Sequence, residues 1–184
     1  IYASLKTIRA WTQPVVGPLY VVLALASGAL LLLLLLGLQG RPLGYLPWLA
    51  VLMLLLAWMM KAAYWSSIDT APRLHSIEAA TGLGGFGPVR QLEPPHTGAN
   101  FVMREMGYEV ARRHAAELRR FAVLLAFLLP IALLLVMRFT PAYLAPALLL
   151  VATLSCALGL LVERWLFFAE AEHVVTLFYG RDRV

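Results

Sequence analysis

The sequence predicts an all-α integral membrane protein: a helical bundle of four transmembrane helices in two antiparallel hairpins, with a long cytoplasmic loop that contains a helix. Two observations predict this class. Hydrophobic residues make up 61% of the 184 residues and charged residues only 14%, whereas a typical soluble domain has about 25% charged residues. The hydrophobic residues gather in charge-free runs, each long enough to cross the ~30 Å hydrocarbon core of a bilayer as a helix.

The apolar runs must be helices, because lipid offers no hydrogen-bond partners to an open backbone. We expect one membrane domain over residues 1–184, with transmembrane segments at about 19–38, 43–63, 121–137 and 143–162. In the second of these segments the charge-free run ends at Met60.

The connections between the segments predict their pairing. Turn-forming residues at 39–42 and 138–141 indicate two tight hairpins. Pro130 lies inside the third run and should kink that helix. The loop at 64–120 ends in a predicted helix that continues unbroken into the third segment, with Arg119 and Arg120 reaching the membrane interface. A tail follows at 163–184.

Positive charge predicts the orientation. Every Lys and Arg except Arg41 and Arg138 lies in the N-terminal segment, between the second and third runs, or after the fourth run. Four crossings place these three segments on the same face, which the positive-inside rule identifies as cytoplasmic. The net charge of +5 is therefore a topology signal, and it indicates attraction to anionic lipid rather than to nucleic acid.

The residues typical of a redox or metal centre are not arranged as one. Cys156 has no second cysteine to pair with. Haem in a membrane cytochrome needs histidines inside the apolar helices. The four histidines lie outside the runs, so we expect no metal-bound or covalently bound cofactor in this chain; they are His75, His96, His114 and His173.

Ionisable residues inside a membrane usually mark an ion path, and the four apolar runs contain none. Glu163 and Arg164 come closest, directly after the fourth run. If that helix continues, Glu170 and His173 have the E-x-x-H spacing that binds metal in some helix bundles. We favour the simpler interpretation, a solvated helix end with its own ion pairs.

The glycines at 82, 84 and 87 match G-x-G-x-x-G letter for letter. A dinucleotide site also needs a strand before the match and a helix starting on it. Residues 76–81 are not strand-like and Pro88 follows at once, so a Gly-rich loop is the better interpretation.

Aromatic residues cluster near the ends of the predicted helices, and a belt at the membrane interface is a sufficient explanation for them. Flat rings beside polar groups also suit a quinone headgroup. The second hypothesis assigns a quinone site to Lys61, Tyr64 and Trp65, together with His96 and Arg104 from the loop. The belt itself would comprise Tyr45, Trp48, Trp58, Tyr64, Trp65, Tyr143, Trp165, Phe167 and Phe168.

Three stretches resemble the membrane-anchor subunits of the dimethyl sulfoxide reductase family: WMMKAAYWSSIDTAP (58–72), PPHTGANFVMREMGYEVARRHAAELRR (94–120) and VERWLFFAEAEHVVTLFYG (162–180). The opening IYASLKTIRAW resembles a mid-chain junction of that family. Since these anchors have about eight transmembrane helices and Ile1 is not a methionine, the chain looks like the C-terminal half of a longer protein.

The resemblance implies a function in a respiratory complex of the bacterial inner (plasma) membrane. Such anchors hold a molybdopterin catalytic subunit and an iron–sulfur subunit and exchange electrons with the quinone pool, without haem. Some oxidise menaquinol, in anaerobic respiration, and similar anchors of cytoplasmic sulfite dehydrogenases reduce quinone, in sulfur metabolism. The stretch PHTGANFVMREMG (95–107) looks closer to the sulfite-oxidising branch. The carboxylate and histidine of the family's quinol site belong to its N-terminal helices, so no residue here takes their role.

We therefore expect a non-catalytic electron-transfer anchor, with docking of the soluble subunits at Asn100, Arg104 and Glu105. Two alternatives stay open. The chain could be a purely structural anchor whose quinone is bound elsewhere, or half of a small transporter. The lack of charge in the apolar runs argues against the transporter.

Overall fold

The structure is a computed structural model. It describes residues 1–71, 76–90, 92–93, 98, 108–172 and 177, with Glu109 described by its backbone alone. Within these ranges the regular secondary structure is helical, as predicted, and includes no strand.

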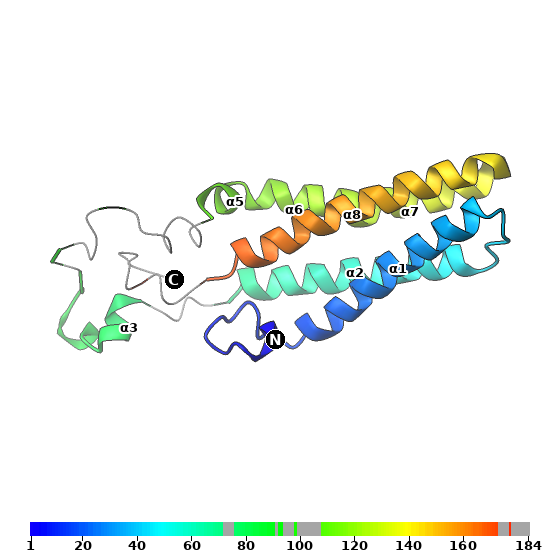
Figure 1. The fold of residues 1–184 in the computed structure, drawn as a ribbon. Coiled ribbons are helices and arrows are strands. Elements are labelled where there is room, and N and C mark those ends of the chain that lie inside the picture. The colour runs from blue at the N-terminus through cyan, green and yellow to red at the C-terminus, as the bar shows by residue number, and fades with distance from the viewer. Residues whose placement is uncertain (72–75, 91, 94–97, 99–107, 173–176, 178–184) are drawn as a thin grey trace.

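Four long helices form two hairpins (Figure 1). The first hairpin pairs α1 (Val16–Leu38) with α2 (Leu46–Asp69), and the second pairs the helix through α6 and α7 with α8 (Ala145–Ala169). All four are long and apolar enough to cross a membrane, which confirms the predicted class. Both hairpin turns lie at one end of the bundle, which we call the turn end. The opposite end carries the chain's long connection, and we call it the loop end.

Shorter elements complete the described chain. A 3₁₀ turn (Tyr2–Ser4) opens it, and two 3₁₀ turns (Met137–Phe139 and Ala142–Leu144) form the second hairpin turn. The long connection contains α3 (Ile77–Thr81), a 3₁₀ turn (Gly84–Phe86) and α5 (Glu109–Arg113).

The third membrane helix is not continuous with the helix before it, contrary to prediction. It consists of α6 (Ala115–Val123), a π-helical turn at Leu124–Leu128 and α7 (Leu129–Val136). The backbone breaks at His114, whose φ of −105° and ψ of 18° are not helical, and α5 is therefore a separate element.

The disturbance expected at Pro130 takes the form of the π-helical turn that precedes it. In that turn the Leu129 N–H donates to the Leu124 carbonyl. The same register would pair the Leu125 carbonyl with the N–H of residue 130, which proline lacks. The Ser155 hydroxyl of α8 donates to the Leu125 carbonyl instead, at 2.7 Å. A side chain on the neighbouring helix therefore satisfies the acceptor that Pro130 leaves open.

Helix α8 lies very close to the π-helical turn because Gly159 has no side chain. A Cβ atom built on Gly159 would lie 2.2 Å from the Ala126 backbone nitrogen. Small residues commonly allow such close approach between membrane helices.

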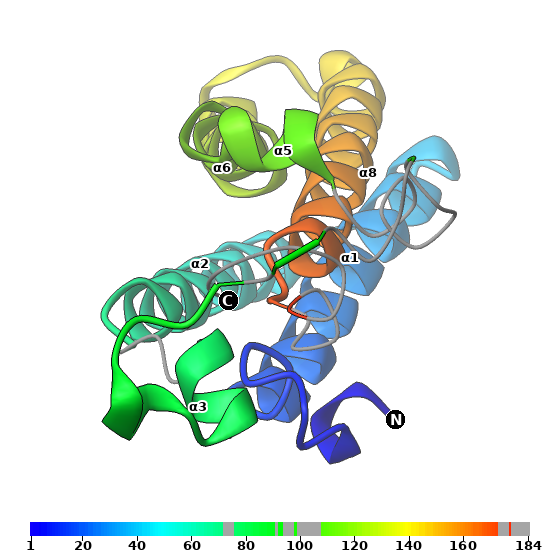
Figure 2. The same cartoon turned by 90° about the vertical axis from the view of Figure 1, so that its left-hand side faces the viewer.

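Helix α1 packs against α2 on one side and α8 on the other, and α8 also packs against α6 and α7 (Figure 2). The buried positions follow steps of three and four residues, as in a coiled-coil seam. In α1 they include Leu19, Leu23, Ala26, Leu30 and Leu33.

The N-terminal segment caps the loop end of the bundle. Trp11 is buried and stacks on Phe167 of α8 at a ring-centroid distance of 5.8 Å. The Trp11 Nε1–H donates to the Phe167 carbonyl at 3.0 Å. Phe167 is only 1% exposed, so it belongs to the core and not to the predicted aromatic belt.

Two helices extend past the apolar runs that predicted them. Helix α2 continues to Asp69, where the Thr70 hydroxyl bonds to the Ser66 carbonyl at 2.8 Å, and α8 continues to Ala169. The first residues of the predicted loop and tail are therefore helical. These extensions bring charged side chains from α2 and α8 together inside the bundle.

Candidate functional site

A buried ion pair joins α2 to α8. Lys61 Nζ contacts Glu163 Oε1, and both side chains are 0% exposed. The apolar runs themselves contain no ionisable residue, but the helices continue beyond these runs and bury the two charges between them. With this pair in the bundle, the argument against a transporter from missing charge no longer holds.

Helical spacing explains the burial. In α2 the buried positions Ala50, Leu54, Ala57, Lys61 and Tyr64 continue one seam with steps of three and four residues. The seam of α8 runs in the same way through Ala152, Cys156, Gly159 and Glu163. Lys61 and Glu163 therefore occupy core positions on facing helices.

Arg164 gives Glu163 a second cationic partner. Its Nε contacts Glu163 Oε2, and its Nη2 donates to Oε1 at 2.7 Å. The guanidinium also lies over the ring of Tyr20 in α1, 4.0 Å from the centroid. The ion pairs predicted for this helix end are present, but Glu163 is buried between two cations instead of solvated. Together Lys61, Glu163 and Arg164 carry one net positive charge.

Two aromatic rings surround the Lys61 ammonium. Its Nζ is 4.2 Å from the ring centroid of Tyr64 and 4.7 Å from that of Trp65. These rings are 1% and 7% exposed, so the belt interpretation was wrong for both. Three of the five residues of the predicted quinone site therefore lie together.

The remaining residues of the predicted sites lie outside the described residues. They are His96 and Arg104 of the quinone hypothesis, and Asn100, Arg104 and Glu105 of the docking hypothesis.

A second charged group lies nearer the loop end. Arg119 of α6 donates to both carboxylate oxygens of Asp69, at 2.6 and 2.9 Å, and to Glu170 Oε1 at 2.7 Å. Its guanidinium lies over Trp65, 5.3 Å from the ring centroid. Arg119 therefore connects α2, α6 and the end of α8, and its position at the membrane interface stays a prediction.

The backbone around Glu170 is fixed by α5. Arg112 donates to the carbonyls of Ala169 and Ala171, at 2.8 and 2.9 Å, on either side of Glu170. Such bonds satisfy carbonyls that a helix end leaves open. Burial raises the pKa of the Glu170 carboxyl, and the charge of Arg119 acts in the opposite direction.

The E-x-x-H pattern is not completed in the structure, since His173 lies outside the described residues. Across the ranges that the structure describes, no three His, Cys, Asp or Glu side chains gather in a way that could hold a metal ion.

A polar pocket of about 270 Å³ opens beside Arg119 and Glu170. It lies between the N-terminal segment and the ends of α2, α6 and α8, and its polar lining residues are Arg9, Gln13, Asp69, Arg119, Glu170 and Glu172.

Four buried polar atoms near this pocket and the ion pair make no well-aligned hydrogen bond to a described residue. They are Lys61 Nζ, Tyr64 Oη, Trp65 Nε1 and Glu170 Oε2. Lys61 Nζ contacts Glu163, and Trp65 lies near Glu170, so Tyr64 Oη is the one of the four without a polar neighbour among the described residues. Buried polar groups are almost always satisfied by protein, water or ligand, so the Tyr64 hydroxyl and the remaining N–H groups of Lys61 can bind a polar partner.

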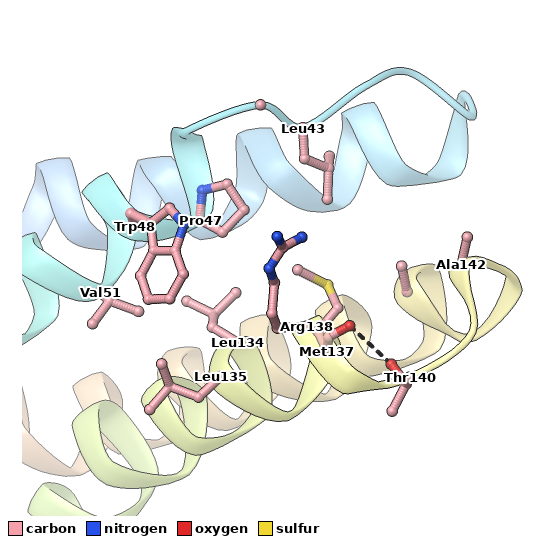
Figure 3. A pocket seen from close by; sticks show the side chains of 12 residues that line it. Leu43, Pro47, Trp48, Val51, Leu134, Leu135, Met137, Arg138, Thr140 and Ala142 are labelled. Carbon is pink, nitrogen blue, oxygen red and sulfur yellow. Dashed lines mark hydrogen bonds between the residues drawn. The ribbon is translucent and has the colours of Figure 1, made fainter.

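The turn end has a different chemistry. A pocket of about 320 Å³ lies there between α2 and α7, lined mainly by apolar side chains such as Trp48, Val51 and Leu134. Arg138 points into it from the second hairpin turn (Figure 3). Arg138 is the single charged residue among the described residues that line this pocket.

The glycine-rich segment is a loop, as predicted. The helix α3 precedes Gly82, where a dinucleotide site would need a strand. Gly82 and Gly87 have φ values of 69° and 132°, which glycine adopts without strain.

The comparisons with known proteins found a curated relative. The chain is 27% identical over 181 residues to a sulfite dehydrogenase subunit of Allochromatium vinosum, and the match covers 97% of this chain and 54% of the relative. The chain thus spans about half the length of that relative. No protein-family model and no solved structure matches the chain. The resemblance to dimethyl sulfoxide reductase anchors stays a prediction, and the relative agrees with the predicted likeness to the sulfite-oxidising branch.

Proposed function

We propose that this chain is a membrane subunit of a sulfite-oxidising complex and that it passes electrons from that complex to quinone beside Lys61. The observation that carries the proposal is the buried Lys61 ammonium between Tyr64 and Trp65, paired with Glu163. An ionisable group inside a membrane protein is a functional-site hypothesis by default.

Membership of such a complex is supported by the relative, whose likeness extends over almost the whole chain. The partners would be a molybdopterin catalytic subunit and an iron–sulfur subunit, docked at the loop end. In this proposal that end faces the cytoplasm of a bacterial cell, because most of the basic residues lie there.

The chemistry of the site suits a quinone. Quinone carbonyl oxygens accept hydrogen bonds. The Lys61 ammonium contacts Glu163 and has further N–H groups to donate, and the Tyr64 hydroxyl beside it makes no hydrogen bond to a described residue. A quinone also gains negative charge as it accepts electrons, which the net positive charge of Lys61, Glu163 and Arg164 would stabilise. It takes up electrons from the iron–sulfur partner and an equal number of protons from water.

The test compares Lys61→Met with Lys6→Met in the complete complex. Lys6 is an exposed lysine of the same chain. We expect Lys61→Met to lower sulfite-dependent quinone reduction by at least about 100-fold, the usual effect of removing one electrostatic contact from a reacting group. Reduction of a water-soluble dye by the catalytic subunits should not change. Lys6→Met should leave both reactions intact.

Lys61→Arg keeps a cation opposite Glu163 and should retain a measurable part of quinone reduction. If Lys61→Met assembles normally and reduces quinone at the wild-type rate, the quinone site is not here. The chain is then the purely structural anchor that the sequence left as an alternative.

A further inference from the structure

We propose that Glu170 is the aqueous entrance of a short file of buried waters that carries protons from the polar pocket to the Lys61–Glu163 pair. The inference rests on the proposed function, because quinone reduction consumes protons at a site that lipid and protein shield from bulk water.

The entrance is the pocket of about 270 Å³ at the loop end. Glu170 lines it, yet its side chain is only 8% exposed, and its Oε2 atom makes no well-aligned hydrogen bond to a described residue, although Trp65 lies near it. Glu170 Oε1 is held by Arg119 at 2.7 Å. One oxygen of the carboxylate is therefore fixed, and the other is available to a water molecule inside the protein.

The interior of the file is marked by Trp65 Nε1, which lies near Glu170, and by Tyr64 Oη, which has no hydrogen-bond partner among the described residues. A tyrosine hydroxyl can accept a hydrogen bond from a water and donate one to the quinone, so Tyr64 can serve both. The file ends at Lys61 Nζ, which contacts Glu163. An unsatisfied buried polar atom is costly, and buried waters usually satisfy groups of them. The residues also follow one another in space, because Arg119 and Lys61 both contact the Trp65 ring, at 5.3 and 4.7 Å from its centroid.

The charges around Glu170 come from every element packed on it. Arg119 faces it from α6, and Arg112 of α5 donates to the carbonyls on either side of it. Asp69 and Lys61 lie on α2, and Arg9 lines the same pocket from the N-terminal segment. Glu172 lies on the pocket rim and is exposed. This mixture of charges allows the Glu170 carboxyl to take a proton from pocket water and release it to the next water without leaving a lone buried charge.

Hydration can be tested independently of quinone chemistry. Brief X-ray exposure of the intact complex converts water into hydroxyl radicals, which modify the side chains next to bound water. We expect Tyr64 and Trp65 to be modified despite their burial. Phe127, which is 1% exposed like Tyr64, lies in the apolar core and should stay unmodified. Equal protection of all three side chains would overturn the water file.

Proton delivery is tested by Glu170→Gln against Glu117→Gln, an exposed carboxylate of α6 outside the lining of the pocket. Glu170→Gln keeps an acceptor for Arg119 but cannot carry a proton. We expect quinone reduction to fall by at least about tenfold, at the low end for a lost proton-transfer group, with a larger loss at high pH. Dye reduction bypasses the quinone site and should stay normal; measured on washed membranes, it also reports that the soluble subunits are still bound. Glu117→Gln should match the wild type, and Glu170→Asp should recover part of the rate.

The two proposals fail differently. Wild-type quinone reduction and an unchanged pH profile in Glu170→Gln would overturn the path, even if Lys61→Met abolishes the reaction. If Lys61→Met has no effect while Tyr64 and Trp65 are labelled, the file exists but the quinone site lies elsewhere.

Discussion

At the scale of single residues, the Lys61–Glu163 pair raises the question of why a membrane bundle buries two charges. Moving a charge out of water is costly, and an ion pair in the interior often contributes little net stability compared with apolar side chains. Removing one partner is different, because it leaves the other charge buried alone. A pair of this kind is therefore better explained by function than by stability. The two members differ in their partners, because Glu163 also pairs with Arg164 whereas Lys61 pairs with Glu163.

Because Glu163 has two cationic partners, we expect Lys61→Met and Glu163→Gln to lower the stability of the protein by different amounts. Lys61→Met leaves Glu163 paired with Arg164, whereas Glu163→Gln leaves Lys61 and Arg164 without a shared anion. We expect Glu163→Gln to cost about 3–5 kcal/mol, as for breaking a buried pair, and Lys61→Met clearly less. Thermal unfolding of the solubilised protein measures both. Equal shifts of the two melting temperatures would show that Arg164 does not compensate for Lys61.

Glu170 predicts a dependence of stability on pH. Burial raises the pKa of its carboxyl above the ordinary value of 4.5. Between the two values the folded protein binds more protons than the unfolded chain, so stability decreases as the pH rises through this window. The thermal midpoint should therefore decrease as the pH rises just above 4.5. Glu170→Gln should show a smaller decrease over the same range, and an identical curve would contradict a raised pKa for Glu170.

At the scale of helices, the third membrane helix depends on its neighbour. Pro130 costs the helix a hydrogen bond, and the π-helical turn at Leu124–Leu128 moves the open acceptor to Leu125. That carbonyl faces α8, where Ser155 donates to it. Gly159 on the next turn of α8 allows the close approach that this bond requires.

A double-mutant cycle tests this dependence. Ser155→Ala should destabilise the protein by roughly 1 kcal/mol, the usual size of an interhelical hydrogen bond in a membrane. In a Pro130→Ala background the helix regains an N–H at residue 130, so the Leu125 carbonyl no longer needs Ser155. We therefore expect Ser155→Ala to cost much less in that background. Additive costs in thermal unfolding would mean that the two residues act independently.

At the scale of the whole molecule, the two ends of the bundle are chemically opposite. Among the residues that the structure describes, the acidic ones lie in the long connection, in the first turn of α6, in the last two turns of α2 and α8, or directly after α8. At the turn end, the hairpin turns contain only Arg41 and Arg138 as charged residues. The polar pocket, the Tyr64 hydroxyl and the buried ion pair therefore all belong to the half of the bundle nearer the loop end, where the proposed partners would dock.

The sequence predicted the four helices because each apolar run is long enough by itself to determine one. It did not predict the buried charges, because every face of these helices is apolar and the runs alone do not reveal which face packs inward. One signal was present: Lys61 and Glu163 each directly follow an apolar run, and both runs end at the same side of the membrane. Lys61 and Glu163 therefore lie at similar depths in the bundle, and opposite charges at the same depth favour an ion pair. The Arg119 contacts with Asp69 and Glu170 needed the structure, because they join residues 50 and 51 positions apart.

The difference between the two ends gives a testable orientation. The native cysteine, Cys156, is 3% exposed, so a membrane-impermeant maleimide should not label it. Gln39→Cys places an exposed thiol at the turn end, and Glu172→Cys places one at the loop end. Because basic residues favour the cytoplasmic side, we expect Gln39→Cys to be labelled in intact cells whose outer envelope is open to the reagent. Glu172→Cys should react only after the inner membrane is permeabilised. The reverse pattern would place the polar pocket on the outer face, and protons for the proposed path would then come from the opposite compartment.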